Sequence, residues 1–285
     1  MSEPIRITLE ADGFEAVMNT AAAEGAIWAE TISGWYGTPE PKVDLVERVS
    51  GDGAHAVPDE AVLYAARVVT IGAVASGAGR DAVNALMESV NVLAHRNVRI
   101  AVADGGGETW AEGYLSTSWA ENAYPGHQRG EITVVCTDPR RYGAARTAYI
   151  VPDGDGGGGL LYDETDGYIL LPIEFYGDAP SANAATVSNA GTSTAHPAII
   201  VRGDFPDGVT INHSGGQLAY PAPIGAGAPL VLDGLTRTAA VLGVDVTRAL
   251  TARDFPAIPP GGSVTLSSLA SGTGTVTVES FDTYI

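Results

Sequence analysis

The pattern of hydrophobic and polar positions changes at residues 131–143, near the middle of the chain. Residues 132–135 are all β-branched and predict a strand. Asp138-Pro139 ends this strand, because proline has no N–H for a sheet and forces the residue before it into an extended conformation. One helix pattern lies before this corner, and short strand patterns follow it. We therefore predict two domains, residues 1–146 and 147–285.

The first domain shows alternating and continuous apolar runs that are typical of strands. Residues 5–10 alternate between apolar and polar side chains, and a hairpin is predicted around Asp104 and the three glycines after it. Residues 50–56 (SGDGAHA) predict an exposed glycine-rich turn. The expected strands are residues 5–10, 27–32, 61–71, 98–103, 109–119 and 131–137. Together they predict a curved antiparallel sheet or a small barrel.

One amphipathic helix is predicted over residues 80–95 in this domain. Its apolar side chains recur at three- and four-residue spacing, and Asp81 lies in the first turn, where an acid suits the helix dipole. The stripe consists of Val83, Leu86, Met87, Val90, Leu93 and Ala94. Such a stripe is typical of a helix that packs on a core.

The second domain contains short apolar runs that are separated by Asp-Gly, Gly-Gly and proline. This spacing favours an antiparallel β-sandwich. The expected strands are residues 185–189, 198–202, 209–212, 217–220, 229–232, 238–242, 263–269 and 275–279. The fold class predicted for the whole chain is therefore mainly β.

Composition narrows the possible functions. The 285 residues include 34 acids and 15 lysines or arginines, giving a formal net charge of −19. A surface of this sign repels phosphate backbones, which disfavours nucleic-acid binding that is independent of sequence. No run of about 18 apolar residues occurs, so we expect no membrane span. The first residues also lack the apolar core of a signal peptide.

The residues that commonly carry chemistry are scattered. The single cysteine, Cys136, leaves no internal disulfide and no cysteine-based zinc site, and its place in a strand predicts a buried, unreactive thiol. The five histidines show no metal-ligand spacing, and nucleophile-elbow, phosphate-loop and dinucleotide motifs are absent from the sequence. We predict no catalytic residue and no cofactor, and expect a protein that is not an enzyme.

One short motif suggests a metal. Asp153, Asp155, Gly158 and Glu164 match positions one, three, six and twelve of a calcium-binding loop. Gly157 stands where a further oxygen ligand is needed, and neither flank predicts a helix. We therefore favour a glycine-rich connecting loop over a calcium site.

Several separated segments together resemble the distal tail protein family of long-tailed bacteriophages, whose members are tail-hub or baseplate components. The last of these segments contains Asn189, Gly191, Thr192 and Pro197 in the order found in the family, ahead of a β-rich strand. The segments are residues 28–41, 64–71, 137–143 and 187–201. The resemblance extends over nearly the whole chain, and it depends on the order and spacing of the segments.

The resemblance implies a fold and a set of partners. It implies an α+β, split-barrel-like N-terminal domain that forms a ring, and a galectin-like antiparallel β-sandwich as the C-terminal domain. It further implies a homohexameric ring between the tail tube protein and the tail tip or fibre hub protein, at the distal end of the virion tail. DNA would pass through the lumen without specific binding, and no membrane would be contacted. The protein would be made in the host cytoplasm. The resemblance favours a non-contractile tail but leaves a contractile one open.

Two groups of residues are expected to have structural roles. Asp138 and Pro139 would form a rigid joint between the domains, where Arg140 and Arg141 would pair with carboxylates. Asn189 and Thr192, with Gly191 and Pro197 in the same segment, would tie a turn to the strand that begins at Ala198.

Two other function classes compete with the structural role. A carbohydrate-binding module of an adhesion apparatus is suggested by the sandwich and by Trp110, Trp119 and Tyr220, which we expect to be exposed aromatic side chains. A hydrolase whose carboxylates come together only in space ranks third. The sugar-binding cluster of true galectins has no counterpart in the sequence, so the resemblance does not imply lectin activity.

Overall fold

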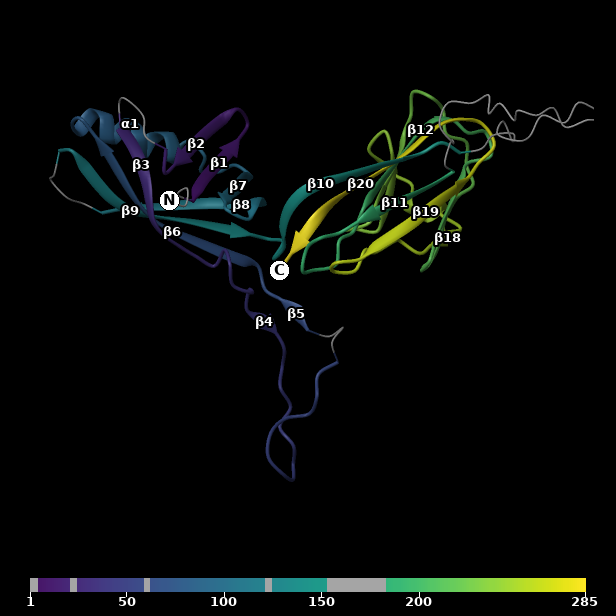
Figure 1. Cartoon of the computed structure of the whole chain (residues 1–285), viewed down its shortest axis with the longest axis horizontal. Coiled ribbons are helices and arrows are strands. Elements are labelled where there is room, and N and C mark those ends of the chain that lie inside the picture. Colours follow the sequence, from purple (N-terminus) through teal and green to yellow (C-terminus); the bar gives the residue numbers. More distant parts are fainter. Residues whose placement is uncertain (1–4, 21–24, 59–61, 121–124, 153–182) are drawn as a thin grey trace, which may run out of the picture. The chain divides into compact units, whose positions relative to one another are not determined.

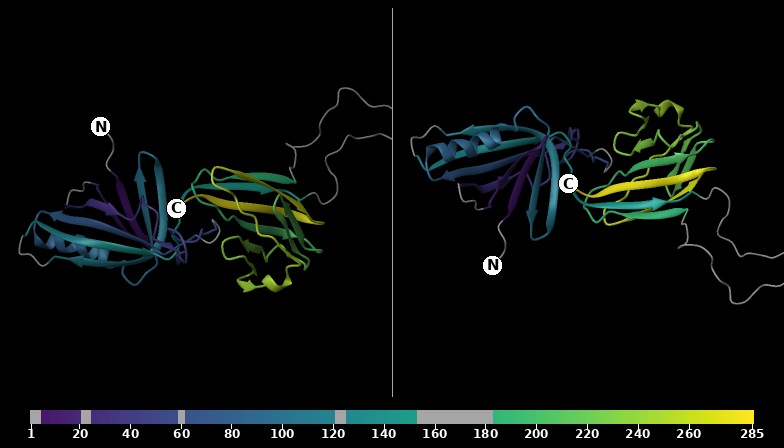
Figure 2. Two further views of the ribbon diagram at one scale, coloured as in Figure 1. Left: turned by 90° about the horizontal axis from the view of Figure 1, so that it is seen from below. Right: turned by 90° about the horizontal axis from the view of Figure 1, so that it is seen from above.

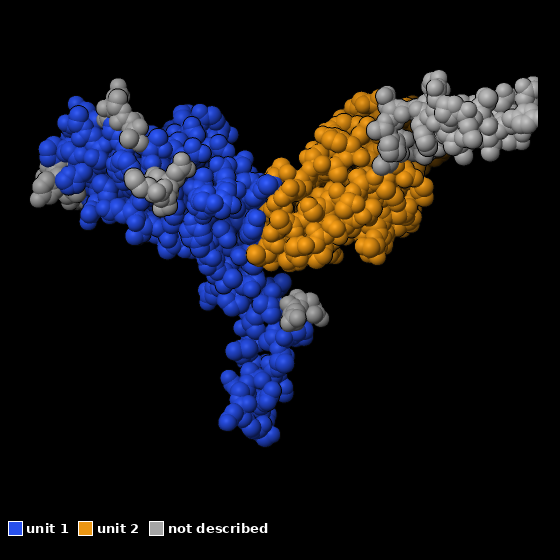
Figure 3. All heavy atoms as spheres, in the orientation of Figure 1, with its two compact units in different colours: residues 1–144, 284–285 blue, residues 145–283 orange. Residues whose placement is uncertain are grey.

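The computed structural model describes residues 5–20, 25–58, 62–120, 125–152 and 183–285. The chain forms two compact units (Figure 3). Unit 1 contains residues 1–144 with 284–285, and unit 2 contains residues 145–283. The candidate calcium loop, with Asp153, Asp155 and Glu164, lies outside the described residues. The described residues are mainly β with one α-helix, so the predicted fold class is confirmed.

Unit 1 is a seven-stranded barrel. Its strands follow the order β8-β7-β1-β2-β3-β6-β9, and β8 also pairs with β9, which closes the barrel. Neighbours are antiparallel except β2 and β3, which are parallel at Met18 and Ile27. The strands are β1 (Arg6–Ala11), β2 (Phe14–Met18), β3 (Gly25–Ser33), β6 (Arg67–Gly77), β7 (Val98–Asp104), β8 (Gly107–Trp119) and β9 (His127–Cys136). Closure leaves the seven strands without a free edge.

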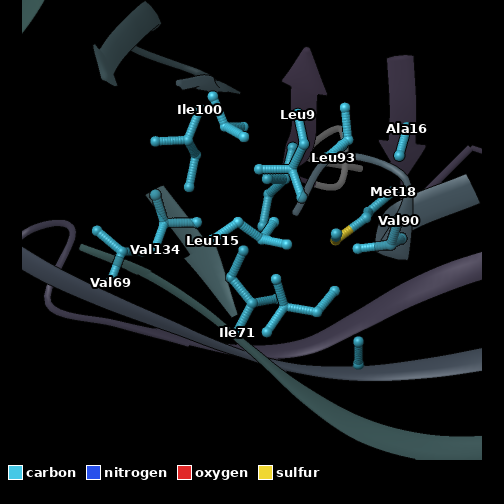
Figure 4. Close-up of a cluster of buried hydrophobic side chains, with 14 of the residues drawn as sticks. Leu9, Ala16, Met18, Val69, Ile71, Val90, Leu93, Ile100, Leu115 and Val134 are labelled. Carbon is cyan, nitrogen blue, oxygen red and sulfur yellow. The ribbon is translucent and has the colours of Figure 1, made fainter. Parts of the chain in front are cut away.

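Apolar side chains from the barrel strands and from helix α1 (Arg80–Asn91) form the core of unit 1. Figure 4 shows Leu9, Ile71, Leu93, Ile100 and Leu115 among these buried side chains. The helix packs against the barrel, as its apolar stripe predicted. It ends at Asn91 and not at the predicted His95, which has a left-handed backbone conformation with φ 64°.

Some strand bounds differ from those predicted. The predicted strand 61–71 is observed as β6, which continues to Gly77, because its small residues pair with both β3 and β9. Alanine and glycine carry little intrinsic strand signal, so the sequence did not reveal this extension. β2 and β10 (Arg141–Ile150) were also missed.

A long hairpin leaves the barrel between β3 and β6. We call its described residues, 38–58 and 62–66, the arm. Its paired strands are β4 (Pro41–Lys42) and β5 (Leu63–Tyr64), and Glu47 and Ala54 form an isolated bridge nearer its tip. Figure 1 shows the arm extending away from the barrel of unit 1.

Unit 2 is an antiparallel β-sandwich (Figure 2). One layer has the order β17-β16-β15-β12-β20-β10 and the other the order β11-β19-β13-β14-β18. The first layer consists of residues 145–150 of β10, β12 (Ala198–Asp204), β15 (Leu230–Asp233), β16 (Thr238–Val241), β17 (Val244–Asp245) and residues 273–283 of β20 (Thr273–Tyr284). The second consists of β11 (Ala184–Ser188), β13 (Val209–His213), β14 (Gly216–Tyr220), β18 (Ala252–Arg253) and β19 (Ser263–Leu269).

The sandwich core agrees with the alternation in the sequence. Inward side chains such as Ile199, Val201, Ile211, Leu266 and Val278 are buried between the layers. A short 3-10 helix, η2 (Thr247–Ala249), follows β17. The last strand is longer than the predicted residues 275–279. β12 pairs with its residues 273–279, and β10 is its neighbour on the other side.

Candidate functional site

The arm carries large apolar side chains that its own chain does not cover. Leu45 and Val46 are each 65% exposed, Leu63 is 61% exposed, and Val49 is fully exposed. Scattered single apolar residues are ordinary on a protein surface, whereas apolar side chains that gather in one exposed region are typical of interaction sites, and these four lie on one projecting segment. The arm is therefore the candidate functional surface of unit 1.

Backbone hydrogen bonds hold the arm in its hairpin form. Arg48 N donates to Gly53 O at 3.1 Å and His55 N donates to Val46 O at 2.9 Å. Closer to the barrel, Ala65 N donates to Glu40 O at 2.8 Å. The hairpin is thus shaped by its main chain, which leaves its apolar side chains available to a partner.

A buried arginine lies at the root of the arm. Arg67, the first residue of β6, is 1% exposed. Its Nη1 donates to the carbonyl oxygens of Gly34 (2.6 Å), Trp35 (3.0 Å) and Gly37 (2.8 Å), and its Nε donates to Pro139 O at 2.8 Å. Burial, and then the nearby charge of Arg141, lower the pKa of Arg67 to about 10. The side chain therefore remains charged at neutral pH.

Gly34 and Trp35 determine the backbone conformation between β3 and the arm. Gly34 has φ +77°, and a Cβ at this position would lie 1.9 Å from Val68 O. Trp35 is fully buried although it lies outside regular strands. A left-handed glycine and a buried indole thus fix the backbone whose carbonyls Arg67 binds.

Arg141 lies among aromatic rings. Its guanidinium carbon is 5.5 Å from the centre of the Trp35 ring, 6.0 Å from Tyr36 and 5.9 Å from Tyr284, and burial lowers its pKa. Rings of this kind attract a cation that has left water. We had expected Arg141 to pair with a carboxylate, but the observed contacts are with the ring faces.

The neighbouring corner is stabilised by Asp138. Its Oδ1 accepts hydrogen bonds from Arg140 N (3.0 Å) and Arg140 Nη1 (3.3 Å), and its Oδ2 accepts one from Tyr142 Oη at 2.5 Å. Arg140 thus pairs with a carboxylate two residues away. Because Pro139 O is bound by Arg67, the corner and the root of the arm share one network. All of these residues belong to unit 1.

Unit 2 contains a second buried polar network, around Asn189. This side chain is 1% exposed, and its Nδ2 donates to Ser193 O at 2.7 Å and Ile258 O at 3.3 Å. Its Oδ1 accepts from Gly191 N (2.9 Å) and Thr283 N (3.0 Å). The predicted partner was the strand at Ala198, whereas these bonds join the 189–193 turn to the 258 loop and to β20.

The other residues predicted in this segment have separate surroundings. A Cβ on Gly191 would lie 1.9 Å from Thr283 O, so the close approach of the two backbones requires glycine. Thr192 is exposed, and Pro197 is buried and accepts a hydrogen bond from Gly234 N at 3.1 Å. Asn189 and Gly191 therefore lie in one network around Thr283.

Sequence reasoning missed an ion pair beside this network. Arg146 Nη2 lies 2.7 Å from Asp282 Oδ2, and Arg146 Nε donates to Asp282 Oδ1 at 3.1 Å. Asp282 Oδ1 also accepts from Ala190 N at 2.8 Å. The hydrogen bonds from Arg146 lower the pKa of Asp282, although burial opposes this. The partners are 136 residues apart, so no local pattern could indicate the pair.

The aromatic side chains that suggested carbohydrate binding do not form an exposed platform. Tyr220 is 6% exposed and belongs to the core of unit 2, so the expectation for it was wrong. Trp119 packs on the barrel core, and its Nε1 donates to Asn91 Oδ1 at 3.2 Å. The Trp110 ring stacks on Tyr142 with centroids 4.9 Å apart and lies under the Arg99 guanidinium at 4.3 Å.

The predictions about metal binding, the cysteine and membrane spans can be compared with the described residues. Within them, no group of three or more His, Cys, Asp or Glu side chains is placed to hold a metal ion. Cys136 is buried, as predicted, and burial raises the pKa of its thiol to about 11. Among the described elements, no helix has the length and apolar character needed to cross a membrane.

Two comparisons of the sequence found nothing: no protein-family model matches the chain, and no curated protein does. Solved structures match it over nearly its whole length. The crystal structure of SPP1 Dit, described as a paradigm of the hub adsorption apparatus in phages that infect Gram-positive bacteria, has a TM-score of 0.64 at 15% identity. The match covers 98% of this chain and 99% of that one.

The phage p2 baseplate in its activated conformation also matches, in structures with Sr and with Ca. Both have a TM-score of 0.52, at 10% and 9% identity, and cover 97% of this chain and 98% of the matched chain. At such identities the likeness is one of fold. The resemblance predicted from the sequence is thus confirmed at that level, and the chain has the fold of phage tail hub and baseplate proteins.

Proposed function

We propose that this protein is a structural component of a phage tail, a distal tail hub that assembles as a ring of six copies. In this proposal the ring joins the tail tube protein to the tail tip or fibre hub protein. The fold likeness over the full length of hub and baseplate proteins supports the proposal. The observation that carries it is the exposed apolar arm of unit 1.

The arm would supply the contact between neighbouring copies. Burying one valine or leucine side chain completely stabilises a complex by about 1.5–3 kcal/mol, before the loss of rigid-body freedom is counted. A few such anchors are enough to hold an interface. An arm that binds a different surface of the next copy makes a head-to-tail contact, and repeated head-to-tail contacts form a ring when the rotation between neighbouring copies closes.

The two units would have different tasks. Residues 1–146 would form the ring, and residues 147–285 would form a galectin-like sandwich that contributes to other contacts of the hub. The net charge of −19 suits a channel through which DNA passes, because an acidic wall repels the phosphates instead of binding them. In this proposal the protein is not an enzyme and functions at the distal end of the virion tail.

The mass of the purified protein in solution tests the proposal. Light scattering after size exclusion, with negative-stain images of the same peak, should show six copies around a central hole. If the protein is monomeric alone, the same measurement is repeated with the tail tube protein encoded beside it. A protein that stays monomeric in both experiments would contradict the hub function.

A further inference from the structure

Arg67 differs from the other charged residues in the described part of unit 1, since it is almost completely buried and its hydrogen bonds go only to backbone carbonyls. Three of the four acceptors belong to residues 34–37, where the chain leaves β3 for the arm. The fourth is Pro139 in the corner. One guanidinium therefore joins the residues directly before the arm, the first residue after the arm and the corner.

A role in barrel stability alone does not explain this arrangement. Burying a cation is unfavourable unless hydrogen bonds compensate for lost water, and apolar side chains of similar size often stabilise a core equally well. Arg67 Nη2 is buried without a hydrogen-bond partner among the described residues, so the compensation is incomplete. The guanidinium fixes the positions of the carbonyls around it. Its N–H groups point in set directions within one plane, so the carbonyl oxygens must be arranged to match them.

The backbone of the arm gives little other control over its direction. β4 and β5 have two residues each, and the next paired positions, Glu47 and Ala54, lie inside the arm. These pairs hold the two sides of the arm together but do not connect it to the barrel. Among the described residues, the links to the barrel run through Arg67 and through residues 34–37, where Tyr36 Oη also donates to Asp104 Oδ2 at 2.8 Å.

We propose that Arg67 is the positioning residue of the arm, which fixes its direction relative to the barrel by binding residues 34–37 and the 138–141 corner together. This inference rests on the proposed function, in which the arm contacts a neighbouring copy. A ring closes only if every contact repeats the same rotation, so a hinge that is loose at the root prevents closure even when the apolar side chains of the arm are intact.

The direction of the arm can be measured with two spin labels. Cys136 is buried, so labels can be placed selectively at Ser50→Cys, in the arm, and Glu15→Cys, on the barrel. In the protein with Arg67, the distance distribution between the labels should be narrow. Arg67→Met keeps an apolar stem but removes all four hydrogen bonds, and should broaden the distribution at least twofold.

Arg67→Lys is the matched charge control. It keeps the positive charge, but a single ammonium group cannot reproduce the fork, so the distribution should again broaden. Thermal melting shows whether each variant folds. If Arg67→Met does not fold, Arg67→Lys still tests the proposal. An unchanged narrow distribution in a folded Arg67→Lys or Arg67→Met protein would overturn the proposal.

A measurement of ring assembly distinguishes a failure of this inference from a failure of the proposed function. Leu45→Ser with Val46→Ser removes apolar contact area at the arm and leaves the root intact. If that double variant assembles like the unsubstituted protein, the arm contact itself is wrong. If the double variant loses the ring while Arg67→Met retains it, the contact stands and the positioning role is refuted. We expect both variants to lower the fraction of assembled protein at least tenfold.

Discussion

The buried polar network around Asn189 and the one around Arg67 differ in how completely their groups are paired. In unit 2, the Asn189 amide and the Asp282 carboxylate meet donors and acceptors from β20, the 189–193 turn and Arg146. In unit 1, Arg67 binds carbonyls alone and keeps an unpartnered nitrogen. The Asn189 amide and the Asp282 carboxylate of the sandwich are thus paired, whereas the arginine at the root of the projecting arm keeps an unpartnered Nη2 atom.

The strongest test of the unit 2 network concerns Gly191. Gly191→Ala places a Cβ against Thr283 O, and because backbone lies on both sides the strain cannot be relieved by a side-chain rotation. We expect a loss of about 3 kcal/mol or more in the free energy of unfolding of unit 2, measured by chemical denaturation. Gly225→Ala is the matched control, since no atom lies within 4 Å of its added Cβ. Equal stability of the two variants would show that the 189–193 turn is not tightly packed.

Removing the ion pair should have a smaller effect. Asp282→Ala leaves Ala190 N without its acceptor and Arg146 without its partner. Because the Arg146 side chain is 41% exposed, solvent compensates for part of the loss, and we expect about 2 kcal/mol. Thr186→Ala, on the exposed face of β11, should change the stability by less than about 0.5 kcal/mol. If Asp282→Ala lowers the free energy of unfolding no more than Thr186→Ala does, the ion pair does not stabilise unit 2.

The Asp282 carboxylate should make the stability of unit 2 depend on pH. The pKa of Asp282 is lowered in the folded protein. The carboxylate therefore contributes its full share of the stability above the pKa of an aspartate in the unfolded chain, about 3.9, and this share is lost as the pH falls through the pKa of the folded state. Unit 2 should therefore lose stability below about pH 4. Asp282→Asn should flatten this part of the profile, and an unchanged slope in the variant would assign the acid sensitivity to other carboxylates.

Cys136 reports on the barrel of unit 1. Its thiol is buried, and its pKa of about 11 leaves little thiolate near pH 8. A thiol reagent should label the folded protein on the order of a hundredfold more slowly than the denatured protein. Arg67→Met should leave this protection in place if Arg67 acts on the arm, whereas fast labelling of the variant would indicate that the barrel itself has opened.

The smallest effect on stability is expected at the tip of the arm. Leu45→Ser with Val46→Ser should change the free energy of unfolding of the monomer by less than about 0.5 kcal/mol, because neither side chain is covered. A larger loss, measured by thermal melting at a concentration at which the protein is monomeric, would mean that the arm packs on its own chain.

Local sequence pattern accounts for much of the fold. The predicted strand 263–269 coincides with β19, the hairpin around Asp104 is present, and the apolar stripe of the predicted helix faces the core in α1. These features depend on neighbours a few residues apart, so the period of apolar positions determines them. The burial of Cys136 follows from the same alternation within β9.

The candidate site was much less predictable. Arg67 could have been noticed as a lone arginine at the start of a β-branched run, but its acceptors lie about 30 and 72 residues away. Arg141 was expected beside carboxylates and lies among three rings, because residues from distant segments meet around it. The amino-acid sequence by itself determined which faces of its strands and helix are buried, through local periodicity. Only the tertiary structure decided which carbonyls, rings and carboxylates surround each buried polar group, because those partners are brought together by chain closure over long separations.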